Sequence, residues 1–170
     1  MDFMHDTEPT LYLLCGIPYA GKSTFADTDP VLAPLPKLST DRLILDKAKR
    51  MGTTYAQIFQ DAFREADKTF REEVKAHFKE GTSFVIDRTS GTPGVRKRFL
   101  KKAKKHGFKV VCLYFEPPPD AELKRRMALR AEQGLSWERV LAFKAGFVVP
   151  TADEGFDACF VVNQQGIRDW

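Results

Sequence analysis

The stretch "GIPYAGKST" at residues 16–24 constrains the fold more than any other part of the 170-residue chain. It follows the apolar run "LYLLC" and has the spacing Gly16-x-x-x-x-Gly21-Lys22-Ser23. A strand, a glycine-bounded loop and a helix N-terminus together present backbone N–H groups and a partial positive charge to phosphate oxygens. The stretch therefore predicts a phosphate-binding loop between a buried strand and a helix.

The residues of this loop have expected roles. We expect Lys22 to reach the outer phosphates of a nucleotide, Ser23 to place its hydroxyl on Mg²⁺, and Thr24 to lie beside it in the first helical turn. Pro18 removes one backbone N–H, and the side chain of Tyr19 is expected to point away from the nucleotide. The candidate nucleotide-binding segment comprises Gly16, Ile17, Pro18, Tyr19, Ala20, Gly21, Lys22, Ser23 and Thr24.

Further apolar runs alternate with segments of helical periodicity. Runs at residues 83–87, 109–115 and 158–162 match strands, and a weaker one lies at 36–40. The longest helical segment extends from about Tyr55 to Glu80, and its aromatic stripe is expected to face the core. This alternation predicts an α/β fold for residues 1–170 as a single domain of three layers, with a central five-stranded, mostly parallel sheet flanked by helices.

Two aspartates follow predicted strands, Asp41 after "KLST" and Asp87 at the end of "SFVID". Ligands of open α/β sheets bind outside the carboxyl ends of the strands. We therefore expect both carboxylates near the terminal phosphate, where such groups accept a hydroxyl proton or hold Mg²⁺ or its waters. The structural alternatives are that Asp41 caps a helix over residues 42–50 and that Asp87 is a turn or cap residue.

A short, highly charged helix is predicted after the fourth of these strands, from Asp120 as its N-cap to about Gly134. Within it Arg126 and Arg130 are four residues apart and share a face. Cations carried by a mobile helix stabilise the charge on a transferring phosphoryl group. We expect a helical lid at approximately residues 118–135, and the alternative is a solvated charged helix.

Composition and charge indicate an ordinary globular protein with one basic segment. The net charge is +4, and a helix expected from about Val95 to residue 106 carries a cationic cluster. Such a helix either meets successive phosphates of DNA or RNA by charge or is a solvated face. The cationic cluster comprises Arg96, Lys97, Arg98, Lys101, Lys102, Lys104 and Lys105.

The sequence also bears on cellular location. No apolar run approaches the roughly 20 residues that span a bilayer. The first ten residues, "MDFMHDTEPT", are acidic where a signal peptide needs a basic region. Cys15, Cys112 and Cys159 lie in apolar runs without metal or redox spacing, and we expect buried reduced thiols. These features predict a cytoplasmic protein without a membrane partner.

Taken in order, "GIPYAGKST", "STDRL", "VIDRTSG", "LKRRMALR" and "PTADEGFDACFVV" resemble the P-loop kinases of the polynucleotide-kinase type. This branch includes zeta toxins and tRNA-directed kinases, and the resemblance spans nearly the whole chain. It implies a P-loop NTPase fold and an ATP- and Mg²⁺-dependent kinase in which Asp41 is the general base. Ser23 and Asp41 would hold the metal, Lys22 and Arg126 would act on the transferring phosphate, and Arg126 and Arg130 would clamp the donor phosphates.

The resemblance assigns the acceptor to Asp41, Arg42, Asp87 and Arg88. In the phage polynucleotide kinases an arginine three residues after the base contacts the acceptor phosphate, whereas this chain has Ile44 at that place and Arg42 beside the base. The D-x-T-N of the family is "DRTS" in this chain. The leading hypothesis is phosphorylation of a 5′-hydroxyl end of DNA or RNA. One alternative is a kinase of a modified base in DNA, a nucleoside or another small hydroxyl compound, and another is a nucleotide-binding switch without turnover.

Overall fold

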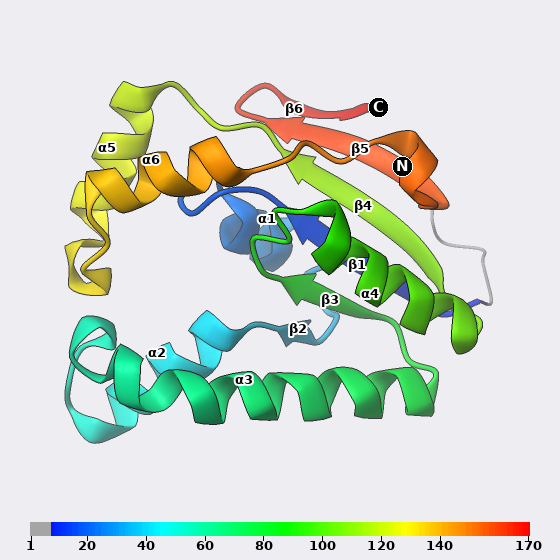
Figure 1. Cartoon of the computed structure of the whole chain (residues 1–170), viewed down its shortest axis with the longest axis horizontal. Coiled ribbons are helices and arrows are strands. Elements are labelled where there is room, and N and C mark those ends of the chain that lie inside the picture. The colour runs from blue at the N-terminus through cyan, green and yellow to red at the C-terminus, as the bar shows by residue number, and fades with distance from the viewer. Residues whose placement is uncertain (1–7) are drawn as a thin grey trace.

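The computed structural model describes residues 8–170, which form a three-layer α/β fold (Figure 1). The strands are β1 (Thr10–Cys15), β2 (Lys37–Leu38), β3 (Phe84–Asp87), β4 (Lys109–Phe115), β5 (Ala158–Asn163) and β6 (Gly166–Asp169). The helices are α1 (Lys22–Thr28), α2 (Thr40–Met51), α3 (Tyr55–Glu80), α4 (Pro93–Lys105), α5 (Asp120–Leu129) and α6 (Trp137–Gly146). Two 3-10 turns are η1 (Ala131–Gln133) and η2 (Ala152–Glu154).

The sheet has the strand order β2-β3-β1-β4-β5-β6, so the strand that leads into the phosphate-binding loop is central. The first five strands of this order pair in parallel. β6 pairs antiparallel with β5 at the edge. The carboxyl ends of the parallel strands therefore meet at one edge of the sheet, where ligands of such folds bind.

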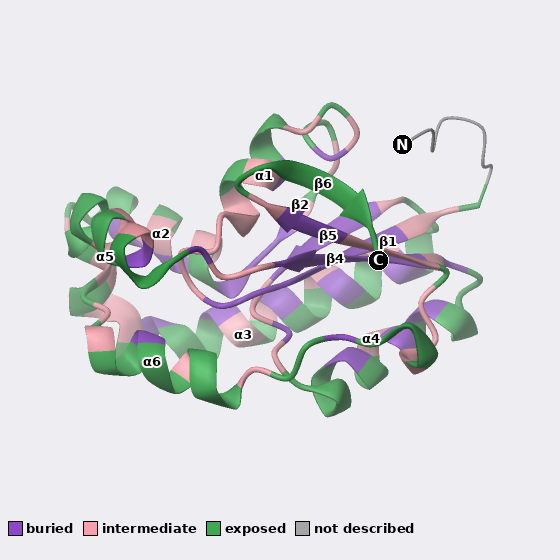
Figure 2. Cartoon of the chain, turned by 90° about the horizontal axis from the view of Figure 1, so that it is seen from above, coloured by how far each residue is buried: buried purple, intermediate pink, exposed green. Residues whose placement is uncertain are grey.

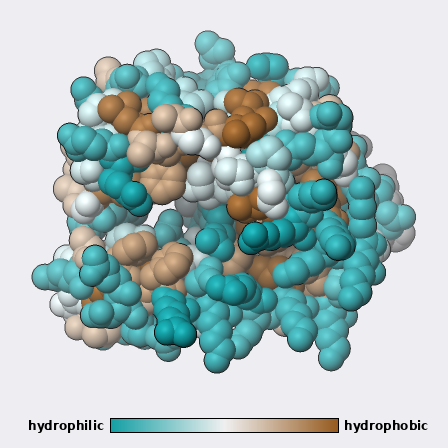
Figure 3. Space-filling model, viewed as in Figure 1, coloured by the Kyte–Doolittle hydropathy of each residue, from teal (hydrophilic) through white to brown (hydrophobic). Residues whose placement is uncertain are grey.

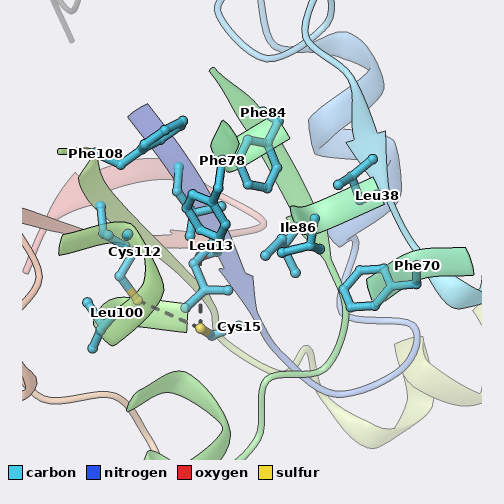
Figure 4. Close-up of a cluster of buried hydrophobic side chains, with 14 residues drawn as sticks. Leu13, Cys15, Leu38, Phe70, Phe78, Phe84, Ile86, Leu100, Phe108 and Cys112 are labelled. Atoms are coloured by element: carbon cyan, nitrogen blue, oxygen red, sulfur yellow. Dashed lines mark hydrogen bonds between the residues drawn. The ribbon is translucent and has the colours of Figure 1, made fainter. Parts of the chain in front are cut away.

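Helices cover both faces of the sheet, as Figure 2 shows for α1 on one side and α3 and α4 on the other. Alternate residues of β1 face opposite sides. Leu13 and Cys15 belong to a buried cluster with residues of α3 and α4, whereas Tyr12 and Leu14 pack with residues of α1. In the first cluster the rings of Phe78, Phe84 and Phe108 meet edge to face at centroid distances of 5.0 to 5.8 Å (Figure 4).

The sheet has six strands, whereas the sequence predicts five. The additional strand is the short β6. All four residues of Gly166–Asp169 are exposed, and "GIRD" has no apolar run that would indicate a strand. Its backbone pairs with the free edge of β5, and this pairing alone makes it a strand. The weak strand expected at residues 36–40 is also shorter, because only Lys37–Leu38 pairs with β3.

The N-terminus of α2 decides one alternative for Asp41. The helix begins at Thr40, and the side chain of Ser39 accepts a hydrogen bond from the backbone N–H of Arg42. Ser39 is therefore the cap, and the alternative that Asp41 caps this helix is wrong. Asp41 lies instead in the exposed part of the first turn.

Other helices agree with expectation in position and differ at their ends. α3 spans Tyr55–Glu80 as expected. The helix expected over residues 120–134 is divided into α5 and η1, and Asp120 is the first helical residue after the cap Pro119. α4 begins at Pro93 after the cap Thr92 rather than near Val95. Proline at a first helical position requires no N–H partner, which explains the earlier start.

The cationic cluster of α4 lacks one of its expected members. Arg96 is completely buried and pairs with Glu154, so it belongs to the interior rather than to the basic face. The other six cations of the cluster are exposed. Spacing on a helix identifies a face, but a buried carboxylate opposite one position can draw that side chain inward.

The cysteine expectation is confirmed for Cys15 and Cys112, which are buried and free, with their sulfur atoms 3.8 Å apart. Cys159 is free and only partly buried. Within residues 8–170, no helix is long and apolar enough to cross a bilayer. Most of the N-terminal stretch that argues against export, residues 1–7, lies outside the described residues.

Candidate active site

The phosphate-binding loop connects the central strand to α1, as the sequence predicts. A Cβ at Gly16 would lie 2.9 Å from the Cβ of Phe115, so the close approach of β4 requires glycine. Tyr19 has a φ of 67°, a left-handed conformation that side-chain-bearing residues rarely adopt. Its carbonyl oxygen accepts a hydrogen bond of 2.9 Å from Nη1 of Arg126. The strained residue of the loop is therefore held by the lid segment.

Lys22 is the point at which the charges of the site converge. Its Nζ donates to the carbonyl oxygen of Ile17 at 2.9 Å. Burial lowers the pKa of Lys22, and the negative charges of Asp87 and Asp41 act against this shift. Both strand-end carboxylates are thus close enough to influence the lysine, so the fold brings together the three groups that the sequence analysis singled out.

Asp87 contacts Ser23 at the end of the loop. Its carboxylate is buried and accepts hydrogen bonds from the hydroxyl of Ser23 at 2.6 Å and from Nε of Arg42 at 3.2 Å. Arg42 also pairs with Asp27 at 3.1 Å. Ser23 and Asp87 together offer the hard oxygen ligands that Mg²⁺ prefers. The acceptor-side role that the resemblance implies for Asp87 stays a prediction.

Asp41 faces the start of α3. Its Oδ1 accepts a hydrogen bond of 2.7 Å from the hydroxyl of Tyr55. Burial and the negative charge of Asp41 raise the pKa of Tyr55, so the phenol remains a protonated donor. This partner was not predicted, because the helical spacing of Tyr55 is that of the aromatic stripe expected to face the core. The sequence signal that could have predicted this contact is the hydroxyl group of Tyr55, the first residue of α3.

Arg88 turns toward α3 rather than toward Asp41. Its Nη1 lies 3.3 Å from Oδ1 of Asp67, and its guanidinium lies 4.7 Å from the centre of the Phe70 ring. Arg42 is held by two carboxylates, as described above. Both arginines expected to bind the acceptor are therefore engaged by acidic side chains.

Residues 118–135, the segment expected to form a lid and called the lid segment here, contact the loop through Arg126. Nε of Arg126 pairs with Glu122 at 2.8 Å, and its Nη1 lies 3.5 Å from where a Cβ of Gly21 would be. Arg130 immediately follows α5. Both arginines line a cavity of about 470 Å³ together with the loop, the first turns of α1 and the ends of β4 and β5. This volume is typical of small-molecule sites.

Two residues that line this cavity, Glu116 and Asn163, carried no signal in the sequence. Nδ2 of Asn163, at the end of β5, donates to Glu116 at 3.0 Å. Arg168 of β6 pairs with the same carboxylate at 3.2 Å. Glu116 and Asn163 lie 47 residues apart in the chain, and the pairing of β4 with β5 brings them to one end of the cavity.

A family model described as an AAA domain matches residues 11–150. The chain belongs to this family. The matched part includes the phosphate-binding loop, both aspartates and the lid segment, and it ends before β5. Among curated proteins, no sequence matches this chain.

Three solved structures show how widely this family's fold is shared. A protein of the PezAT toxin-antitoxin system of Streptococcus pneumoniae is 16% identical, with 95% of this chain and 69% of that chain covered and a TM-score of 0.70. A sugar kinase from Janibacter is 16% identical, with 92% and 86% covered and a TM-score of 0.61. A gluconokinase from Sinorhizobium meliloti is 14% identical, with 92% and 84% covered and a TM-score of 0.53. The fold is that of P-loop kinases, and it does not select the polynucleotide-kinase branch.

Proposed function

We propose that the protein is an ATP- and Mg²⁺-dependent kinase that transfers the γ-phosphoryl group to a hydroxyl acceptor. The contacts of the two strand-end carboxylates carry this proposal: Asp87 accepts a hydrogen bond from Ser23 of the loop at 2.6 Å, and Asp41 accepts one from Tyr55 at 2.7 Å. A nucleotide-binding switch needs the loop and a metal ligand. It has no need of a second, exposed carboxylate oriented by a tyrosine hydroxyl, so Asp41 favours turnover over the switch.

The donor side has a residue for each requirement of phosphoryl transfer. Ser23 and Asp87 hold Mg²⁺, which offsets the charge of the phosphate oxygens when it is bound. Lys22 binds the outer phosphates from the loop, and Arg126 and Arg130 approach them from the lid segment. We therefore assign Asp87 to the metal rather than to the acceptor, and it replaces Asp41 as the proposed metal ligand.

Asp41 acts as the general base on the acceptor side. It accepts the proton of the acceptor hydroxyl as the oxygen of that group forms a bond to the γ-phosphorus. The bond between the γ-phosphorus and the bridging oxygen breaks, and ADP leaves. The hydroxyl of Tyr55 donates to Asp41 and fixes the orientation of the carboxylate for this step.

The charges of the acceptor side favour an uncharged acceptor. Arg42 is paired with Asp27 and Asp87, and Arg88 is paired with Asp67. An anionic acceptor would have to displace one of these carboxylates, which costs the free energy of an ion pair. We therefore place an uncharged hydroxyl compound first among the acceptors.

A 5′-hydroxyl end of DNA or RNA is the second candidate, supported by the exposed lysines of α4. This helix leads directly into the amino end of β4, so Lys101, Lys102, Lys104 and Lys105 approach the opposite edge of the sheet from the loop (Figure 1). A polynucleotide would have to extend along α4 to meet them. The basic face thus supports nucleic-acid binding more than it supports delivery of an end to Asp41.

Transfer from labelled ATP tests the proposal. The acceptors are nucleosides, neutral sugars, gluconate, shikimate, 5′-hydroxyl oligonucleotides and duplexes with hydroxylated bases, each with Mg²⁺ and with chelator. The expected result is Mg²⁺-dependent transfer to an uncharged compound. Transfer to oligonucleotides alone would support the second candidate, and release of phosphate to water without transfer to any acceptor would contradict the kinase.

A further inference from the structure

We infer that the acceptor is nucleoside-like, a neutral hydroxyl compound joined to a flat ring, and that Phe63 stacks on that ring. The inference rests on the proposed function and names its substrate class. It comes from the part of α3 that extends beyond the sheet, beside Asp41.

The length of α3 leaves its first half uncovered by the sheet. Its 26 residues span about 39 Å, whereas the four residues of β3 span about 13 Å. The helix ends where β3 begins, at the amino edge of the sheet. Its N-terminal half therefore passes the carboxyl edge, where the loop and both aspartates lie. Figure 3 shows a hollow in this face of the molecule with apolar atoms beside it.

Phe63 continues the core stripe of α3 into this region. It lies on the same helical face as Phe70 and Val74, which are buried against the sheet. Phe70 is 2% exposed and Phe63 is 40% exposed. This face of α3 is therefore buried at Phe70, where the sheet packs against it, and exposed at Phe63, beyond the end of the sheet.

A continuous row of aromatic rings joins Phe63 to the proposed base. The ring of Tyr55, whose hydroxyl donates to Asp41, lies 5.3 Å from the ring of Phe59. The rings of Phe59 and Phe63 are 5.4 Å apart. An acceptor whose hydroxyl reaches Asp41 therefore has an aromatic surface along one side, and a flat ring covers such a surface better than a polyol does.

The neighbouring charges agree with a neutral ring. Arg88, which lies above Phe70 on this side, is already paired with Asp67. Asp67 follows Phe63 by one helical turn and pairs with Arg71 as well as with Arg88, so both arginines at this end of the aromatic row are engaged by a carboxylate. A sugar acid bound here would bring its negative charge close to Asp41. Arg42 and Arg88 would not compensate that charge, because both already pair with carboxylates.

Binding measurements test this inference without requiring turnover. Adenosine, thymidine, glucose and gluconate are titrated by calorimetry into protein saturated with Mg²⁺ and a non-hydrolysable ATP analogue, which keeps nucleosides out of the donor site. Phe63→Leu removes the ring and retains an apolar side chain, and Phe63→Tyr retains the ring. We expect the nucleosides to bind, Phe63→Leu to weaken them about tenfold and Phe63→Tyr to leave them within about twofold.

The outcomes separate this inference from the proposed kinase. The role of Phe63 is overturned by any of three results. Glucose or gluconate binds as tightly as the nucleosides, no nucleoside binds, or Phe63→Leu binds nucleosides as tightly as the original protein. Nucleoside binding without transfer from ATP overturns the kinase and leaves the ring site standing. Affinity of a 5′-hydroxyl oligonucleotide equal to or above that of its nucleoside supports the inference and distinguishes a polynucleotide end from a free nucleoside. Unchanged affinity for the ATP analogue shows that both variants are folded.

Discussion

The guanidinium of Arg96 is completely buried and donates two hydrogen bonds of 2.8 Å to the carboxylate of Glu154. Its Nη1 also donates to the carbonyl oxygens of Ser90 and Val148, each at 2.9 Å. One side chain thus fastens the loop after β3 to the segment between α6 and β5. The glutamate of "PTADEGFD" has a structural partner, and this pair stabilises the carboxyl edge of the sheet where the site lies.

Removing Arg96 leaves the carboxylate of Glu154, whose side chain is 13% exposed, and the carbonyl oxygens of Ser90 and Val148 without their donor. We expect Arg96→Met to lower the free energy of unfolding by about 3 to 5 kcal/mol, measured by urea denaturation. The control is Arg98→Met, which removes an exposed charge from the same helix and is expected to cost less than about 0.5 kcal/mol. An equal effect of both variants would contradict a buried ion pair at Arg96.

Asp41→Asn removes the proposed base and preserves the shape of the side chain. We expect kcat for transfer to fall by about 10²- to 10⁴-fold, with affinity for an ATP analogue within about twofold of the original. Asp46→Asn on the same helix is the control, since Asp46 is also exposed and lies more than a turn away. Retention of most of the transfer rate by Asp41→Asn would show that another group is the base.

Asp87→Asn tests the proposed metal ligand. We expect the strengthening of ATP binding by Mg²⁺ to fall about 10- to 100-fold, because the amide lacks the negative charge that the cation requires. Binding is measured with Mg²⁺ and with chelator. Asp27→Asn is the matched control, because it also removes a carboxylate partner of Arg42 and does not contact Ser23. A similar loss in both variants would assign the effect to Arg42 instead.

Glu122 pairs with Arg126, and its lowered pKa predicts that the pair keeps its charges between about pH 5 and about pH 8. Hydrogen bonds from Arg125 and Arg126 lower the pKa of Glu122 to about 2. Because the folded pKa lies below the ordinary value, the pair is present above about pH 4.3 and is lost as the pH falls through about 2. We expect Glu122→Gln to weaken ATP binding by a similar factor at about pH 5 and about pH 8. If Glu122→Gln weakens ATP binding at only one of these two pH values, a titrating group other than Glu122 controls the effect.

Gly134 brings the lid segment into contact with α3. Its φ is +66°, and a Cβ there would lie 2.8 Å from the Cβ of Ala56. Gly52 has the same φ and no neighbour within 4 Å, so Gly52→Ala is a control for backbone strain alone. We expect both alanine variants to lose about 1 kcal/mol of stability, and Gly134→Ala alone to speed hydrogen exchange in η1. Equal exchange in both would show that the contact does not hold the lid segment.

Local pattern was sufficient to predict the loop, the long helix and the strands that form the sheet centre. Buried strands and amphipathic helices depend on residues close in the chain, so their signals are local. The edge strand β6 and the burial of Arg96 depend on partners distant in the sequence, the edge of β5 and Glu154. Neither partner could be identified from spacing.

By itself the sequence determined the phosphate-binding loop, the two strand-end aspartates and the order of the elements around them, because glycine spacing and apolar runs encode backbone geometry locally. Only the tertiary structure decided that Asp87 contacts Ser23, that Tyr55 orients Asp41, and that Phe63 lies open beside the site. Which partner a side chain receives depends on strand order and on helix length relative to the sheet. These relations exist only once the elements have packed.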